Sequence, residues 1–500
     1  MIETFLSVNK NKKLLIVHHV IANNMMTITE LEEKLDISAK QIKRYIREIN
    51  DDSFTLSNTI IFDKNGEDIY LLPMTKQESL ALYNDLTHSY LNDSSLFQII
   101  LLLTTHDRLA LPTILKELSM SRSFFYKQLK KLNVILAIHG LEIKTSNSIF
   151  YLSGKEIAIR LFSFHFMVEC TKHGSWHFPY TTKTEIHHCF PQLSSLLSAT
   201  LKSNDKFYIF FAILQNRIKY HHYLIDDLNI VSYTNAIEKE KELSVISFDN
   251  FKKYLEAQQL FDTELQMLEF RYFIFFTHAY LSELYDESEI IFFLENLEEN
   301  SRKRKEYPFI LEIITEWAKK FHIPKDSYKD IKHFCILFMI ASIDLKLTTK
   351  QAFPLHNLDI YTEHNIDTKL FTSLSDVIKN TIKQSQFLNS NSRQIILENS
   401  DYLTGVLYNK TKFYNYQKPV IYLYFEKDIT SHTLTKQFLK RSYNNNLVTF
   451  TTNINQASLV ITNQANIKVK SVKDICFLDN YYNKKSLNHV LNTINKYLLL

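Results

Sequence analysis

The sequence predicts a mainly α-helical, multidomain protein that begins with two winged helix-turn-helix units and ends with a small α/β domain. Three observations lead to this fold class. A helix-turn-helix pattern occurs twice near the start of the chain, strand-like segments with short turns follow each copy, and the 500 residues include only five glycines. Because few glycines mean few sharp turns, long helices should dominate the region between the two ends.

The repeated pattern runs from Thr29 to Asn50 and again, 83 positions later, from Pro112 to Asn133. Each copy reads as a short helix, a turn with a serine at the N-cap of the next helix, and a second helix. Apolar residues in the second helix recur at i, i+4 and i+7, which predicts one buried stripe. The matched positions are Leu31 with Ile114, Leu35 with Leu118, Ser38 with Ser121, Ile42 with Phe125, Ile46 with Leu129, Ile49 with Leu132 and Asn50 with Asn133.

The outward faces of the two second helices are basic. Lys and Arg outnumber Glu by four to one between Ser38 and Asn50 and by four to none between Ser121 and Asn133, whereas the whole chain carries a net charge of only +4. Such local charge suits the neutralisation of phosphates by a small module. We therefore predict contact with double-stranded DNA through Lys40, Gln41, Lys43, Arg44, Arg47, Arg122, Ser123, Tyr126, Lys127 and Lys130.

The chemistry of these side chains indicates which of them contact bases and which contact phosphates. Arg44 and Arg47 are the candidates for base edges, because Arg can bind guanine with two hydrogen bonds. The lysines are expected to bind phosphates, which position a protein on the duplex without reading its sequence. Tyr126 either stacks on a sugar or packs within the module.

Each copy is followed by a predicted β-hairpin. After the first copy, Thr59–Phe62 and Ile69–Leu72 flank Lys64-Asn65-Gly66, and Asn-Gly between apolar runs is a strong hairpin signal. After the second, Leu141–Lys144 and Ile149–Leu152 flank a polar turn. A basic helix face is usually only a solvated surface. Two copies with matching turns, apolar positions and wings favour paired winged helices instead.

The remaining two thirds of the chain change character twice. From about Gly154 the sequence predicts amphipathic helices rich in Phe and Tyr, which a charged stretch at 298–308 divides into two blocks. From about Gln417, short strands alternate with helices, which predicts a small α/β domain with a largely parallel sheet. The expected helices are 157–167, 207–218, 265–284, 310–321, 331–345, 432–441 and 487–499, and the expected strands are 420–425, 447–451, 458–462 and 474–478.

Composition excludes several classes of protein. Hydrophobic residues make up 45% and charged residues 22%, as in ordinary globular proteins. The four cysteines are widely spaced and none forms a CxxC pair, which indicates buried thiols in a reducing cytoplasm.

No apolar run reaches the roughly 18 residues that span a bilayer, so no membrane association is expected. The sequence has no phosphate loop, HExxH or GxSxG motif, and the Cys and His residues of 170–189 lack a recognised ligand spacing. We expect no catalytic site, cofactor or metal.

This domain order resembles the Mga/AtxA family of virulence regulators, with the Mga/RofA branch as a close second placement. The most specific local match is Ser153-Gly154-Lys155-Glu156 with Arg160 and Phe162, followed by Trp176-His177-Phe178-Pro179-Tyr180. The resemblance implies an activator that works as a homodimer through its C-terminal domain. It implies winged helices at 1–73 and at 74–152, the latter with two linking helices, PRD-like regulatory domains at 153–297 and 298–415, and an enzyme-IIB-like domain at 416–500.

The resemblance also implies regulation by histidine phosphorylation, with phosphocarrier proteins of the sugar phosphotransferase system as partners. The chain departs from that pattern. Asp205 stands where one regulatory histidine is expected, and it is either a partial mimic of a phosphate or an ordinary exposed carboxylate. His278 lies two places beyond another expected position, and His333 precedes a helix core out of register. The loop from Glu426 to His432 has no cysteine for phosphate transfer, so the last domain is expected to be structural or sensory.

Two other functional classes remain open from the sequence. A PRD-type antiterminator would bind RNA, but winged helices suit the grooves of B-form DNA, and such antiterminators begin with a different, small β domain. A component of the phosphotransferase system would need the missing cysteine.

Overall fold

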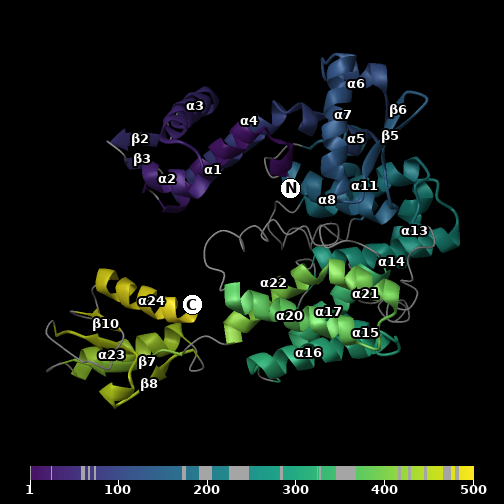
Figure 1. Ribbon diagram of the computed structural model, residues 1–500. Helices are drawn as coiled ribbons and strands as arrows, with labels where there is room; N and C mark the ends of the chain where they lie inside the picture. The colour runs from purple at the N-terminus through teal and green to yellow at the C-terminus, as the bar shows by residue number, and fades with distance from the viewer. Residues whose placement is uncertain are drawn as a thin grey trace. The chain divides into compact units, whose positions relative to one another are not determined.

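The computed structural model divides the chain into two compact units, residues 1–304 with 336–357 and residues 305–335 with 358–500, and each unit is described by itself. The fold is mainly helical with a small parallel sheet near the C-terminus, as the sequence predicts (Figure 1). The described residues are 2–23, 25–57, 62–65, 68–71, 75–171, 176–190, 205–224, 247–281, 285, 287–323, 325, 328–344, 368–414, 418–425, 429–443, 447–464, 474–478 and 484–499.

The first winged module follows a short 3-10 turn, η1 (Ile2–Phe5). The side chain of Thr27 and that of Glu30 cap the start of its second helix reciprocally, which satisfies two backbone N–H groups. The next helix, Ala39–Ser57, buries Ile42, Tyr45 and Ile49 on one face. The module consists of α1 (Val8–Asn23), β1 (Met25–Thr27), α2 (Ile28–Leu35), α3 (Ala39–Ser57), β2 (Phe62–Asn65) and β3 (Asp68–Leu71).

The second module repeats this order of elements. Its helix α7 opens at Ser121, whose hydroxyl accepts a hydrogen bond from the amide of Phe124 at 3.3 Å, as the N-cap pattern predicts. Ser38 also stands at the N-cap position of α3, but its hydroxyl lies 3.4 Å from Gln41 Oε1, and the Ala39 amide donates to Glu32. The module consists of α5 (Ser95–His106), β4 (Arg108–Ala110), α6 (Leu111–Glu117), α7 (Arg122–Ala137), β5 (Glu142–Ser146) and β6 (Ile149–Ser153).

Both wings are antiparallel hairpins completed by a third short strand, in the orders β1-β3-β2 and β4-β6-β5. The second wing turns through Asn147 and Ser148, which both adopt positive φ, at 51° and 62°. In the first wing the expected Asn65-Gly66 turn is wrong by one residue, because Asn65 ends β2 and pairs with Asp68. Residues 66–67, like residues 59–61 of the expected strand, lie outside the described residues.

The asparagine that matches between the two copies joins α3 and α7 to their wings. Asn50 Oδ1 accepts from the amide of Phe62 at 3.0 Å, and its Nδ2 donates to the carbonyl of the same residue at 2.9 Å. Asn133 makes the same pair of bonds with Ile143, at 2.7 and 3.3 Å. Phe62 and Ile143 lie on edge strands, whose outer polar groups would otherwise lack partners.

A linking helix, α4 (Lys76–Asn92), packs against α1 and α3, so it completes the core of the first module. The start of α4 is capped reciprocally by Thr75 and Glu78. The helix α8 (Glu156–Thr171), which follows the second wing, is almost entirely buried and packs against α11 (Lys206–Lys219) and η1. Gly154 permits this entry into α8, because a Cβ there would lie 2.9 Å from the carbonyl oxygen of Gly140.

The helical block of the first unit has a core of aromatic rings. Phe211 and Phe273 pack 5.7 Å apart between α11 and α14, and Phe251 of α13 stacks on Phe273 at 5.0 Å. Aromatic side chains bury large apolar areas, so their removal from water is expected to dominate the stability of this core. The helices are α8 (Glu156–Thr171), α9 (Lys183–Cys189), α11 (Lys206–Lys219), α13 (Phe248–Ala257), α14 (Thr263–Tyr280) and α15 (Glu287–Ser301).

The second unit contains most of the second helical block. Trp317 is its largest fully buried side chain, and the indole Nε1 donates to Thr411 Oγ1 at 2.8 Å. The helix α17 continues into a short π-helical segment, η6 (Ile340–Asp344), and crosses the division between the units. The block is built from α16 (Tyr307–Phe321), α17 (Tyr328–Met339), α20 (Thr368–Gln384), α21 (Ser390–Glu398) and α22 (Ser400–Tyr414).

The C-terminal domain is a four-stranded parallel sheet in the order β10-β9-β7-β8, which confirms the α/β prediction. Its strands carry the apolar core that the sequence predicts, with Ile421, Leu459 and Ile461 fully buried. The elements are β7 (Val420–Tyr424), α23 (Ile429–Ser442), β8 (Thr449–Phe450), η7 (Ile454–Gln456), β9 (Leu459–Thr462), β10 (Asp474–Phe477) and α24 (Lys484–Leu499). Within the described residues, no helix has the length and hydropathy that crossing a bilayer requires.

The asparagine bonds yield a prediction about the wings. Replacing Asn133→Ala leaves the amide and carbonyl of Ile143 without these partners, which should cost about 1–3 kcal/mol of local stability. Hydrogen exchange at the Ile143 amide should then accelerate roughly five- to 150-fold. Ser146→Ala, an exposed change in the same wing, is the control and should leave that rate unchanged. Equal exchange in both variants would contradict the role given to Asn133.

Candidate nucleic-acid interface

The outer face of α3 presents every side chain that the sequence assigns to it. Lys40, Gln41, Lys43, Arg44 and Arg47 are all exposed, because the apolar stripe of the helix faces the module core. Within the described residues, no carboxylate forms an ion pair with either lysine or with Arg47, so these charges remain available to phosphates.

Arg44 differs from its neighbours because other groups hold it in place. Its Nε lies 3.5 Å from a carboxylate oxygen of Glu48, and its guanidinium lies over the ring of Tyr45 at 5.1 Å. The ion pair with Glu48 lies at the surface, so its cost on release is small, and the Tyr45 ring is a buried platform that Arg44 covers from the solvent side. Arg44 is therefore oriented in advance while its other N–H groups stay accessible.

The outer face of α7 carries the second predicted set. Arg122, Ser123, Tyr126, Lys127 and Lys130 are exposed, and the described residues place no carboxylate within ion-pair distance of these three cations. The helix itself contains no acidic residue. Its positive N-terminal end adds to the attraction for anions.

Tyr126 both packs and remains accessible. Its ring lies edge-on to Phe125 at 5.6 Å and 6.2 Å from the ring of Phe150 in the wing, and Arg122 lies over it at 5.8 Å. The sequence left packing and sugar stacking as alternatives for this residue. The rings it contacts provide the packing, and its exposed part stays open to solvent.

Sequence reasoning missed a buried ionic network where the second module meets the helical block. Asp107, which follows α5 and is only 1% exposed, forms an ion pair with Arg217 of α11. Arg217 also binds Glu156, at the start of α8, at 2.6 and 3.0 Å. His222 Nε2 lies 3.2 Å from the other oxygen of Asp107.

A second arginine extends the network into α14. Arg160 is 2% exposed, binds Glu156 through Nε at 2.7 Å, and binds both oxygens of Glu269 at 2.5 and 2.9 Å. It also donates to the carbonyl of His222 at 3.0 Å. Burial alone would raise the pKa of the Glu156 carboxyl, but Arg160 and Arg217 hold that pKa below its ordinary value of 4.5.

The network gives a structural role to Glu156 and Arg160, two residues of the stretch that resembles the Mga/AtxA family. Glu156 and Arg160 connect α8 to α11 and α14, and Asp107 connects them to the end of α5. The spacing of Glu156 and Arg160 by four residues was visible in the sequence. Their partners, 61 and 109 positions away along the chain, were not.

The predicted regulatory positions, Asp205, His278 and His333, lie outside α3 and α7. Asp205 precedes α11, and its carboxylate pairs with Lys183 of α9 at 2.6 Å. His278 is in the last turn of α14, and its side chain lies outside the described residues. His333 is 5% exposed within α17.

The cysteines correct one prediction. Cys170, Cys335 and Cys476 are buried as expected, but Cys189 at the end of α9 is exposed. Burial raises the pKa of the Cys476 thiol in β10, so this group is poorly suited to act as a nucleophile. Among the described residues, no cluster of His, Cys, Asp and Glu has the arrangement to hold a metal ion. The loop 426–428, which the sequence shows without a cysteine, lies outside the described residues.

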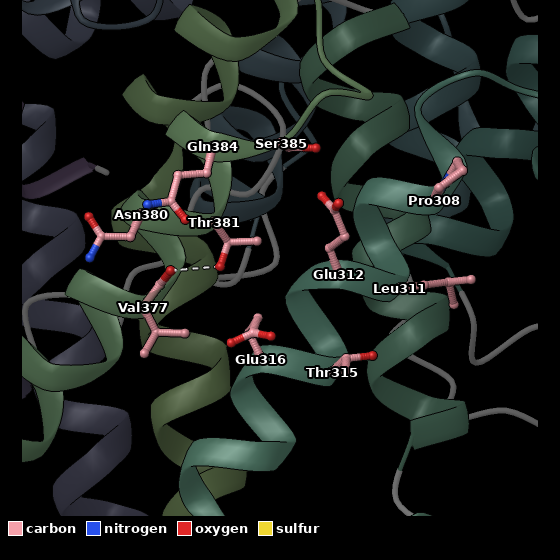
Figure 2. Close-up of a pocket in the computed structure, with 10 residues that line it drawn as sticks. All are labelled: Pro308, Leu311, Glu312, Thr315, Glu316, Val377, Asn380, Thr381, Gln384 and Ser385. Carbon is pink, nitrogen blue, oxygen red and sulfur yellow. Dashed lines mark hydrogen bonds between the residues drawn. The ribbon is translucent and has the colours of Figure 1, made fainter.

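A groove of about 600 Å³ lies between α16 and α20 in the second unit. Figure 2 shows Glu312 and Glu316 extending from one wall and Asn380 and Gln384 on the other. In the described part of the chain, one carboxylate oxygen of Glu312 is inaccessible and has no hydrogen-bond partner. The acidic wall would repel a phosphate backbone, so the groove is not part of a duplex-binding surface.

Comparison with known families identifies the second module. Residues 81–167 match the family model of the Mga helix-turn-helix domain, from within α4 to within α8. The match confirms the resemblance to Mga/AtxA-like regulators and supports a DNA-binding transcriptional regulator rather than an enzyme. No curated protein matches the chain.

The ionic network predicts the effect of removing one arginine. Arg217→Met leaves Asp107 and Glu156 buried without this cation, which should lower the opening free energy of the ends of α5 and α11 by about 3–5 kcal/mol. Hydrogen exchange measures this change. Lys219→Met removes an exposed cation from the same helix and should cost less than about 1 kcal/mol. Similar losses in both variants would show that the network does not anchor α11.

The network also predicts a dependence on pH. The folded-state pKa of Glu156 is lowered, so its contribution to stability is complete above its unfolded value of 4.5 and is lost as the pH falls toward the folded value. The midpoint temperature of thermal unfolding should therefore decrease when the pH is lowered below about 4.5. Glu156→Gln should flatten this fall, although its midpoint at neutral pH is lower. An unchanged slope in the variant would assign the acid sensitivity to other carboxylates.

Proposed function

We propose that this regulator, which carries an Mga helix-turn-helix domain, binds duplex DNA through both winged modules and activates virulence-type genes. The observation that carries this proposal is the pair of exposed basic faces on α3 and α7. Apart from Arg44, their cations form no ion pair within the described residues and can neutralise phosphates. In this proposal α3 and α7 lie in the major groove, or one lies in the groove and the other on the backbone.

We further propose that the helical blocks are PRD-like sensors of a metabolic signal that the sugar phosphotransferase system delivers. Asp205, His278 and His333 are the candidate regulatory positions. A carboxylate needs no phosphorylation to be negative, so Asp205 would act as a constant charge rather than a switch, and Lys183 partly compensates that charge. The C-terminal α/β domain would support a homodimer.

In this proposal the buried ionic network carries the signal between the sensor and the second module. A movement of α11 or α14 must either carry Asp107 with it or separate buried charges, and separating them costs several kcal/mol. The end of α5 would therefore follow the helical block as one body. This coupling requires no ligand contact with the recognition helix itself.

Equilibrium binding of the full-length chain to duplex DNA tests the function. Affinity should fall steeply with salt, and Lys130→Ala should weaken binding to all sequences and reduce the salt slope by about one. Arg44→Ala should cost about 1–3 kcal/mol on the preferred site and loosen specificity. Both positions are exposed, so both variants should fold.

Lys319→Ala is the matched control, because Lys319 is an exposed cation on α16 outside both modules. Equal losses on preferred and random duplexes for Arg44→Ala would contradict its assignment to base edges. Tighter binding to hairpin RNA than to duplex DNA would overturn the proposal in favour of an antiterminator.

A further inference from the structure

The two recognition helices occupy equivalent positions in their modules but present different chemistry. The 83-residue offset places Phe124 at the position of Gln41 and Tyr126 at that of Lys43. Their buried positions still correspond, with Phe125 at the place of Ile42 and both side chains fully buried. The difference is therefore confined to the outer face, where it does not affect the core.

Phe124 is the residue of this face that neither the core nor the proposed phosphate contacts explain. Its side chain is 42% exposed in the first turn of α7, three residues after the N-cap Ser121. In helix-turn-helix proteins, residues near the N-terminus of the recognition helix contact base edges. Phe124 and Lys127 are three residues apart, so they lie on the same face of the helix.

The surroundings of Phe124 favour nucleic acid over a protein as the occupant. Arg122, Lys127 and Lys130 surround it along the helix, no acidic residue occurs in α7, and no described carboxylate neutralises these cations. Such a surface attracts a polyanion. In the major groove the apolar feature that distinguishes a base is the 5-methyl group of thymine, which Phe can contact.

We infer that Phe124 is a specificity-determining residue that reads a thymine methyl group in the major groove, an inference that rests on the proposed DNA binding. The two modules would then differ in how they read sequence. The first relies on the hydrogen-bonding side chains of Gln41, Arg44 and Arg47. The second adds an apolar contact that favours thymine over bases without a methyl group at that position.

Replacement of thymine by deoxyuridine tests the inference, because it removes only the methyl group. The full-length chain first selects its preferred duplex from a random library, and each thymine is then replaced in turn. At one position the wild-type chain should bind about four-fold more weakly, the effect of burying one methyl group. Phe124→Ala should bind the thymine and deoxyuridine duplexes equally, and Phe124→Leu should retain part of the preference.

Two variants serve as controls. Val134→Ala removes an apolar side chain that is 72% exposed farther along α7, and it should keep the thymine preference. Gln41→Ala should keep it as well, although its overall affinity falls. All variants should show the helical content of the wild type.

The outcomes separate this inference from the function on which it rests. Salt-sensitive duplex binding without any thymine preference, or with a preference that persists in Phe124→Ala, overturns the role of Phe124 and leaves the regulator intact. Unchanged DNA binding by Phe124→Ala with an altered oligomeric state in size-exclusion chromatography overturns it in favour of a protein contact. Absence of duplex binding by the wild-type chain overturns both.

Discussion

The buried ionic network around Glu156 is the interaction on which the arrangement of the first unit depends. It joins the end of α5, the start of α8, and the helices α11 and α14 through two arginines and three carboxylates. Burying such charges costs several kcal/mol per ion, so the network adds little net stability. The network instead fixes the relative positions of these helices, because any rearrangement that separates the partners leaves a charge unpaired in the interior.

The same network offers a structural reason why the Mga helix-turn-helix match continues beyond the second wing into α8. The helix α8 begins with Glu156 and Arg160 and packs against η1 and α11. Phe166 contacts both Phe5 and Phe97, at 5.6 and 5.5 Å. The first helix of the helical block is thus also a structural part of the region that the Mga helix-turn-helix model matches, and the two cannot move independently at this point.

The modules show how a repeated core can support different surfaces. Asn50 and Asn133 bind the edge strand of their wings in the same way, so the orientation of helix and wing is retained. On the outer face, Gln41 and Lys43 correspond to Phe124 and Tyr126. Because outward side chains make few contacts with the core, they can diverge at little cost to stability.

Local information in the sequence was sufficient for the winged modules, the helical character of the body and the strands of the C-terminal sheet. Periodicity and capping depend on neighbours within a few residues, and all ten predicted contact residues are exposed on α3 and α7. The tertiary structure alone decided the long-range partners of Asp107, Arg160 and Arg217, because the ion pairs Arg217–Glu156, Arg160–Glu269 and Arg217–Asp107 join residues 61, 109 and 110 positions apart. It also decided that Asn65 ends a strand rather than forming the turn, since strand register is set by pairing across the hairpin.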